Sequence, residues 1–261
     1  NWTVDTTLLG IISGTAATAI YGVGSQINQY YMALSTSISG VFTPQINRIV
    51  ARGEGDEQLT ELFTRVGRIQ FMLLMLVLTG FVFVGEPFIC AWGGEEYGAA
   101  YWIALLLIAP VTVPLIQNIG IEIQRAKNMH QFRSKVYFCM AIGNALVSIP
   151  LGMKFGGIGC ALGTAISMVV GNGFIMNWYY QTHIGLDMRY FWKHILSIVP
   201  AMLPAVALGI IAVRLHTFTG YAGVVTFAVP YAAVYAVGLY LFAMDESEKN
   251  MVRGVMRKIR R

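Results

Sequence analysis

Charged residues are scarce in this chain and are missing from long stretches of it. Asp, Glu, Lys and Arg make up 12% of the 261 residues, and hydrophobic residues make up 56%. A soluble domain carries about 25% charged residues, so the composition argues against a soluble fold. The runs without charge are 6–47, 69–85, 97–121, 136–153, 155–182, 195–213 and 215–244. They are continuously apolar instead of alternating, which argues against a membrane β-barrel.

Metal-ligand and catalytic patterns are also missing. The three cysteines, Cys90, Cys139 and Cys160, lack metal-ligand or redox spacing, and the four histidines lie far apart in the sequence. The sequence has no Walker loop, dinucleotide fingerprint, nucleophile elbow or His-Glu-x-x-His motif. We therefore expect no metal site, no organic cofactor and no enzymatic activity, and we expect H⁺ or Na⁺ at most as a coupling ion.

The uncharged runs predict an all-α, polytopic transmembrane helix bundle. About 20 apolar residues in a helix cross the hydrocarbon core of a bilayer. The run 6–47 is too long for one crossing, and Gly10, Ser13 and Gly14 predict a turn near its start. The predicted crossings are 16–46, 67–87, 97–121, 134–153, 157–181, 194–214 and 221–243. A truncated span precedes them, because the chain starts only about 12 residues before the turn; a re-entrant or interfacial piece is the alternative.

The positions of Lys and Arg orient these crossings. Successive gaps on one side hold four, four, two and six of the 18 bases, and the other side holds only Lys154 and Arg214. By the positive-inside rule, the basic side and the C-terminus are cytoplasmic. The sequence pI of about 9.1 then reflects topology and contact with anionic lipids, and nucleic acid is not an expected partner.

The tail 245–261 is basic and has helical periodicity. Asp245 can cap a helix whose apolar positions include Met251, Val255 and Ile259. We expect an amphipathic helix on the inner leaflet; the alternative is a frayed basic tail.

Polar residues inside the predicted spans are the candidate functional residues. Asp5 is the one acid in the first segment, where it could bind a cation, a proton or a substrate group, or could simply be hydrated near the outer interface. In the span 16–46, polar side chains recur at spacings of four, three, seven and four, which places them on one helical stripe. These are Tyr21, Ser25, Asn28, Ser35 and Ser39. Such a stripe lines a water-filled path, which we expect here, or bonds to a neighbouring helix.

A second polar group lies at the cytoplasmic end of the span 97–121. Asn118, Glu122 and Arg125 follow an i, i+4, i+7 pattern, which fits a gate, a contact to an anionic head group, or an interfacial salt bridge. On the next span, Asn144 and Ser148 form a short polar face that helix–helix hydrogen bonding explains. The glycines that start at Gly156 predict a tight outer turn with positive φ angles.

Several motifs, taken in order, resemble bacterial polysaccharide flippases over about residues 1–195. The quoted segments are Tyr21 with Phe42-Thr43-Pro44-Gln45-Ile46, Ala91-Trp92-Gly93-Gly94 with Tyr97, Gln124-Arg125-Ala126-Lys127-Asn128-Met129-His130-Gln131-Phe132-Arg133, Gly156-Gly157-Ile158-Gly159 through Ser167, Asn177-Trp178-Tyr179-Tyr180 and Gly185-Leu186-Asp187. The order and spacing of these segments are more specific than any one of them.

The resemblance implies the C-terminal half of an O-antigen-type flippase of the multidrug/oligosaccharidyl-lipid/polysaccharide exporter superfamily. Residues 1–181 would form the C-lobe, from the end of span 7 to span 12, and 194–243 would add two further spans. The whole protein would move a polyprenyl-pyrophosphate-linked oligosaccharide outward across the bacterial inner membrane by alternating access, in polysaccharide or lipopolysaccharide synthesis. Its partners would be that lipid-linked sugar, anionic lipids and the missing N-terminal lobe. The alternatives are a multidrug or metabolite cation antiporter and a membrane-embedded glycan polymerase or glycosyltransferase.

Overall fold

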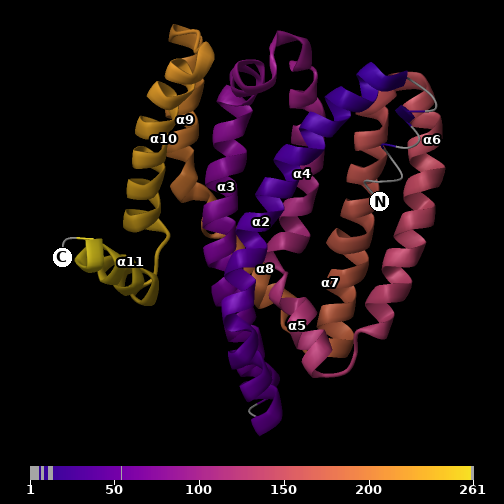
Figure 1. Ribbon diagram of the computed structural model, residues 1–261. Helices are drawn as coiled ribbons and strands as arrows, with labels where there is room; N and C mark the ends of the chain where they lie inside the picture. Colours follow the sequence, from indigo (N-terminus) through magenta and orange to yellow (C-terminus); the bar gives the residue numbers. More distant parts are fainter. Residues whose placement is uncertain (1–5, 7–8, 11–13, 54, 260–261) are drawn as a thin grey trace.

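The fold is an α-helical bundle. The computed structural model describes residues 6, 9–10, 14–53 and 55–259, and no strand occurs among them. Figure 1 shows the long helices standing side by side, with the short helix α11 lying across the end of α10. The predicted all-α class is therefore confirmed for the described residues.

Three long helices form the centre of the bundle. They are α2 (Gly14–Arg52), α3 (Asp56–Gly93) and α4 (Ala100–Ile116), with a short 3₁₀ turn, η1 (Glu95–Tyr97), between α3 and α4. α2 packs closely on α4 at Gly24, because a Cβ at this position would lie 2.8 Å from Ile103 Cγ2. Helix α5 (Ile119–Ala126) follows α4 after a bend of 42°, so the predicted span 97–121 is broken near its C-terminal end.

A helical hairpin packs against α4. It begins with α6 (Gln131–Met168), which reverses direction at Gly156, where φ is +58°. Glycine tolerates this angle because it has no Cβ, so the predicted turn with a positive φ is confirmed, and its place on the outer side stays a prediction. The returning limb continues through the π-helical segment η2 (Val169–Ile175), α7 (Met176–Tyr179) and the π-helical segment η3 (Tyr180–Ile184).

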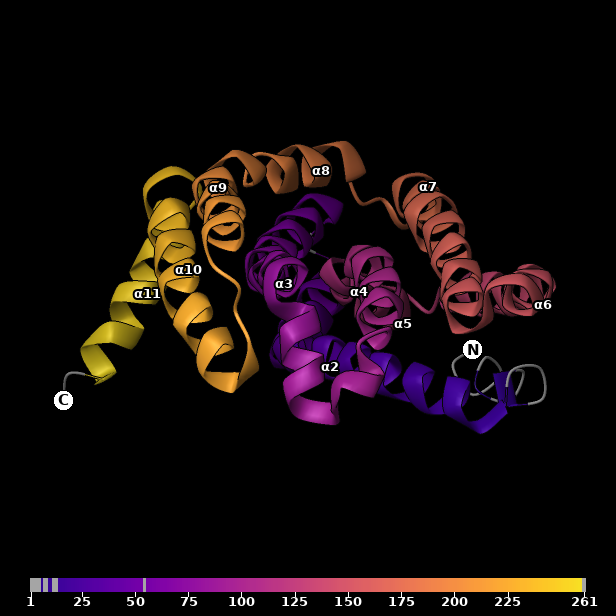
Figure 2. The same cartoon turned by 90° about the horizontal axis from the view of Figure 1, so that it is seen from above.

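The remaining helices surround α3. Helix α8 (Met188–Leu196) bridges α7 and α9 on the side of the bundle opposite α2, as Figure 2 shows. Phe191 of α8 packs against Phe63 of α3, with ring centroids 4.7 Å apart and ring planes tilted by 45°. Helices α9 (Val199–Leu215) and α10 (Gly220–Phe242) form a pair that packs on α3.

A buried ion pair between Arg68 and Glu248 connects the C-terminal helix α11 (Glu246–Ile259) to α3. Asp245 Oδ1 accepts the Glu248 N–H at 2.7 Å, and Glu248 Oε2 accepts the Asp245 N–H at 2.9 Å, which is a reciprocal capping box. Arg68 donates two further hydrogen bonds, of 2.9 and 3.0 Å, to the Glu248 carboxylate. The predicted cap is confirmed and the tail is helical; its place on the inner leaflet stays a prediction.

The predicted seven crossings are not confirmed. Four helical segments are long and apolar enough to cross a membrane, namely Asp56–Gly93, Gln131–Ile184, Met188–Leu215 and Gly220–Phe242, and the bent pair α4–α5 makes up to five. Two predicted spans, 134–153 and 157–181, fall within the one segment Gln131–Ile184. Helix α2 is long enough, at about 58 Å, but its polar side chains keep it out of this set.

Candidate functional site: the two polar faces of α2

The predicted stripe of α2 faces the interior of the bundle. Tyr21, Ser25, Asn28, Ser35 and Ser39 are all buried, with relative exposures of 0–7%. We expected these side chains to line a water-filled path. The structure corrects this expectation, because the stripe lies against α3, α4 and α5.

A hydrogen-bonded network joins the C-terminal half of this stripe to three neighbouring helices. Ser35 Oγ donates to Leu115 O of α4 at 2.8 Å. Gln70 Nε2 of α3 reaches the hydroxyls of Ser35 and Ser39 at 2.8 and 2.7 Å. Asn118 Nδ2, at the start of α5, donates to Ser39 Oγ at 3.2 Å. The network fixes the relative positions of the helices, which is the alternative that the periodicity had left open. Gln70 completes the set and was not a predicted site residue.

The N-terminal half of the stripe makes different contacts. Tyr21 lies in a small apolar cluster with Ile103 and Leu107 of α4, and Ser25 Oγ donates to Gly22 O of its own helix at 3.0 Å. Asn28 is completely buried, and neither polar atom of its amide has a hydrogen-bond partner among the described residues. It is therefore an uncompensated polar group at the interface between α2 and its neighbours.

The other predicted residues lie in separate places. Asn144 Oδ1 accepts from Ser148 Oγ at 2.8 Å and from Thr164 Oγ1 at 3.3 Å, which ties the two limbs of the hairpin together as expected. Arg125 donates to Glu122 Oε1 at 2.7 Å in a largely exposed pair. Asp5 lies outside the described residues.

The opposite face of α2 is also polar, and it is exposed. Sequence reasoning missed this face, whose polar residues recur less regularly, at spacings of three, one, six, one and eight. We define the exposed polar face by Gln26, Gln29, Tyr30, Thr36, Ser37 and Gln45. Ala33, Gly40 and the exposed apolar side chains of Leu34 and Val41 lie among them, so this face mixes polar and apolar groups. From residue 26 to residue 45 this face is about 28 Å long, close to the thickness of a hydrocarbon core.

The polar groups of this exposed face bond only locally. Thr36 Oγ1 donates to Met32 O at 3.3 Å and Ser37 Oγ to Ala33 O at 2.8 Å, both within α2. Gln26 Nε2 donates to Tyr30 OH at 2.9 Å, and Gln29 has no partner among the described residues. Lipid tails offer no hydrogen bonds to amides and hydroxyls, so this face requires contact with water or with further protein.

A basic pocket lies between α5 and the start of α6. Its volume is about 530 Å³, and Ile121, Arg125, His130, Arg133, Ser134 and Tyr137 line it. Arg133 donates to Tyr137 OH at 2.7 Å, and its guanidinium carbon lies 4.7 Å from the centre of the same ring. Tyr137 OH in turn donates to Asn172 Oδ1 of η2 at 3.0 Å.

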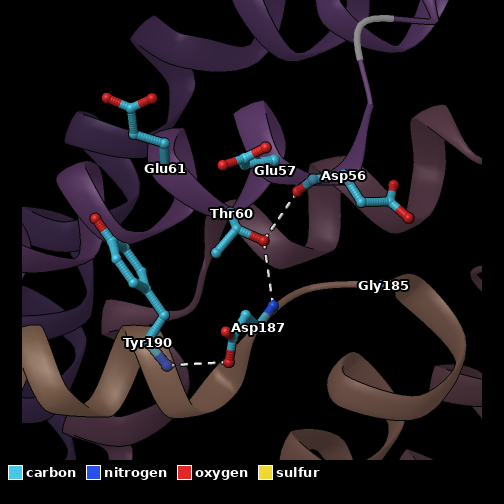
Figure 3. Close-up of a pocket in the computed structure, with 7 residues that line it drawn as sticks. All are labelled: Asp56, Glu57, Thr60, Glu61, Gly185, Asp187 and Tyr190. Carbon is cyan, nitrogen blue, oxygen red and sulfur yellow. Dashed lines mark hydrogen bonds between the residues drawn. The ribbon is translucent and has the colours of Figure 1, made fainter.

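An acidic pocket of about 400 Å³ lies between the starts of α3 and α8 (Figure 3). Its hydrogen bonds connect the start of α8 to α3, so we interpret it as a structural contact between these helices; it is called the joint below. Asp187 caps α8 by accepting from Arg189 N and Tyr190 N, and its own N–H donates to Thr60 Oγ1 at 3.1 Å. Asp56 forms an ion pair with Lys127. Within the described part of the chain, no group of His, Cys, Asp and Glu side chains could hold a metal ion.

Comparison with known proteins gives one informative match. No family model matches the chain, and no solved structure matches it. The sequence is 26% identical to "Probable flippase AglR" from Haloferax volcanii over 174 residues. These residues are 65% of this chain and only 36% of the relative, so the chain spans about a third of the protein that it matches. The chain is thus an α-helical, membrane-type protein with a distant similarity to a probable flippase.

Proposed function

We propose that this chain forms one lobe of a flippase that moves a polyprenyl-diphosphate-linked oligosaccharide from the cytoplasmic to the outer leaflet. One observation carries the proposal: the exposed polar face of α2 is about as long as a bilayer core is thick. Such a face is costly against lipid and is well suited to a path between two lobes. The distant similarity to a probable flippase supports a transport role over an enzymatic one.

In this proposal the two faces of α2 have separate tasks. The buried stripe holds α2 against α3, α4 and α5, and the exposed face meets the substrate path and the second lobe. Residues 1–181 would form the lobe, 194–243 would add two helices at its edge, and the C-terminus would lie in the cytoplasm. Movement of this lobe against its partner would then expose the path to each side of the membrane in turn.

Coupling to an ion gradient belongs to the same proposal. Asp5 is our candidate for binding H⁺ or Na⁺, and Asp5→Asn should abolish any dependence of transport on the gradient. The antiporter alternative requires a buried carboxylate that is free to bind a cation. Among the described residues the buried carboxylate is Glu248, which is already paired with Arg68.

The test measures flipping in vesicles that contain the complete protein and a fluorescent lipid-linked oligosaccharide. A membrane-impermeant quencher reports the amount of label in the outer leaflet over time. Thr36→Val on the exposed face should slow flipping at least fivefold, because it removes a hydroxyl from the path. Thr226→Val on α10 is the matched control, since Thr226 is also exposed and also bonds to a carbonyl of its own helix, Ala222 O, at 2.7 Å. Equal rates for the two variants would contradict the proposal, and so would a complete protein that does not flip the lipid.

A further inference from the structure

The basic pocket between α5 and α6 differs in charge from three other pockets of the described structure. The joint of Figure 3 is lined by carboxylates. Two further hollows, one between the limbs of the α6 hairpin and one between α3 and α10, are lined almost entirely by apolar side chains. The basic pocket carries Arg125 and Arg133, with His130 beside them.

From this lining we infer that the pocket binds a phosphoryl anion, and that its ligand is the diphosphate head group of the lipid-linked substrate. The inference rests on the proposed function for the identity of the lipid, but the anion site itself is argued from the pocket. Two guanidinium groups in one concave site match the charge and the planar donor geometry that phosphate oxygens accept best.

Arg133 is held in position before any ligand arrives. Its side chain stacks on Tyr137 and donates one hydrogen bond to the Tyr137 hydroxyl. That hydroxyl is itself anchored to Asn172 on the returning limb of the hairpin. The other N–H donors of Arg133 have no hydrogen-bond partner among the described residues. A guanidinium that is already oriented loses less conformational entropy on binding, so this anchoring favours the anion complex.

Arg125 supplies the second cation from the facing helix. Among the described residues its charged partner is Glu122, and 65% of its side-chain surface remains exposed. The Glu122 carboxylate neutralises one of the two arginine charges, which leaves the pocket with a net charge of about +1 when His130 is neutral. Helix α5 also carries Asn118, which is bonded to Ser39 of α2. The same short helix therefore links the pocket to α2.

The neighbouring bases show that charge alone does not define the site. Lys127 lies two residues from Arg125, but it donates to Asp56, which lines the acidic pocket. It also donates to Ile184 O at 2.7 Å. Lys135 lies two residues from Arg133 but lines the apolar hollow between the hairpin limbs. Lys135 is thus a matched control for Arg133, with the same charge, the same helix turn and a different surface.

The experiment measures binding of inorganic diphosphate and of farnesyl diphosphate to the protein in nanodiscs of phosphatidylcholine, by isothermal titration calorimetry. The double variant R125Q/R133Q should bind both probes at least tenfold more weakly. Lys135→Gln should change the affinity less than twofold. Tyr137→Phe keeps the charges but removes the hydroxyl that holds Arg133, so we expect a loss of about threefold. Melting temperatures of the variants verify that each one is folded.

Three outcomes would overturn the inference. They are unchanged binding by R125Q/R133Q, an equal loss in Lys135→Gln, and binding of inorganic diphosphate without binding of farnesyl diphosphate. The vesicle assay separates this inference from the proposed function. If R125Q/R133Q loses binding but flips lipid at the wild-type rate, the site is not a substrate site, while the flippase proposal stands. If the wild-type protein binds both probes but flips nothing, the flippase proposal fails, while the anion site stands.

Discussion

The two polar faces of α2 carry the same kinds of polar side chain, but they differ in the groups with which those side chains form hydrogen bonds. On the buried face, Ser35 and Ser39 share hydrogen bonds with Gln70 and with groups on α4 and α5. On the exposed face, Thr36 and Ser37 bond only to carbonyls of α2 itself. The first arrangement holds helices together, and the second leaves a polar surface for water or a partner. A polar stripe in a membrane helix therefore has to be judged by its partners as well as by its spacing.

The largest expected difference between the two faces concerns their glycines. A Cβ on Gly24 would lie 2.8 Å from Ile103 Cγ2 and 3.1 Å from the backbone nitrogen of Ala104, whereas one on Gly40 would meet nothing within 4 Å. We expect Gly24→Val to lower the free energy of unfolding by about 1–3 kcal/mol through overpacking. Gly40→Val should be neutral or slightly stabilising, because glycine is a poor helix former. Thermal unfolding monitored by tryptophan fluorescence in detergent checks both, and equal melting temperatures would contradict the assignment of the faces.

The second prediction removes a shared acceptor from the buried face. Ser39 Oγ accepts from both Gln70 and Asn118, so Ser39→Ala removes two hydrogen bonds between helices, although Gln70 Nε2 keeps its bonds to Ser35. Interhelical hydrogen bonds in membrane proteins contribute about 0.6–1.7 kcal/mol each, and we expect a loss of about 1–2 kcal/mol. Ser37→Ala on the exposed face is the matched control and should cost less than about 0.5 kcal/mol. The comparison fails if Ser37→Ala is the more destabilising variant in the same melting assay.

The sequence was sufficient to predict the all-α class, because long uncharged runs are a direct consequence of the bilayer as a solvent. It was not sufficient to tell which face of α2 packs. Ser35 and Ser37 are equally polar, and only the positions of Leu115 and Gln70 decide which hydroxyl is buried. The polar positions of α2 outside the first stripe were a signal for the second face, since a lipid-facing surface of this length should be apolar.

Contacts between distant parts of the chain could not be predicted from the sequence either, because they depend on how the helices pack. The cap of α11 at Asp245 follows from local spacing and was predicted, but the pairing of Glu248 with Arg68, 180 residues away, depends on tertiary packing. Likewise, a salt bridge between Arg125 and Glu122 was one of the alternatives that local spacing offered, whereas the pocket that Arg125 shares with Arg133 and Tyr137 appears only when α5 and α6 come together.

The third prediction tests the member of the buried face that has no hydrogen-bond partner. Asn28 is fully buried with both amide atoms unbonded in the described structure. Replacing it with leucine, which has a similar branched shape but a larger volume, removes an uncompensated polar group at some cost in overpacking, and we expect a net stabilisation of about 1 kcal/mol. Asn144→Leu is the contrasting control, since Asn144 holds Ser148 and Thr164, and it should destabilise. A lower melting temperature for Asn28→Leu would contradict this prediction.

The smallest expected effect on stability belongs to Gln29, and it separates the two faces most clearly. The Gln29 side chain is exposed on α2 and bonds to no described residue, so Gln29→Leu should change the free energy of unfolding by less than about 0.5 kcal/mol. The same substitution should slow lipid flipping by the complete protein at least fivefold, because it places an apolar group on the proposed path. Gln70→Leu gives the opposite pattern, since Gln70 acts through packing: stability should fall first, and flipping should fall only in proportion to the folded fraction. If Gln29→Leu instead lowers the melting temperature and leaves flipping intact, the exposed face is a packing surface, and the path lies elsewhere.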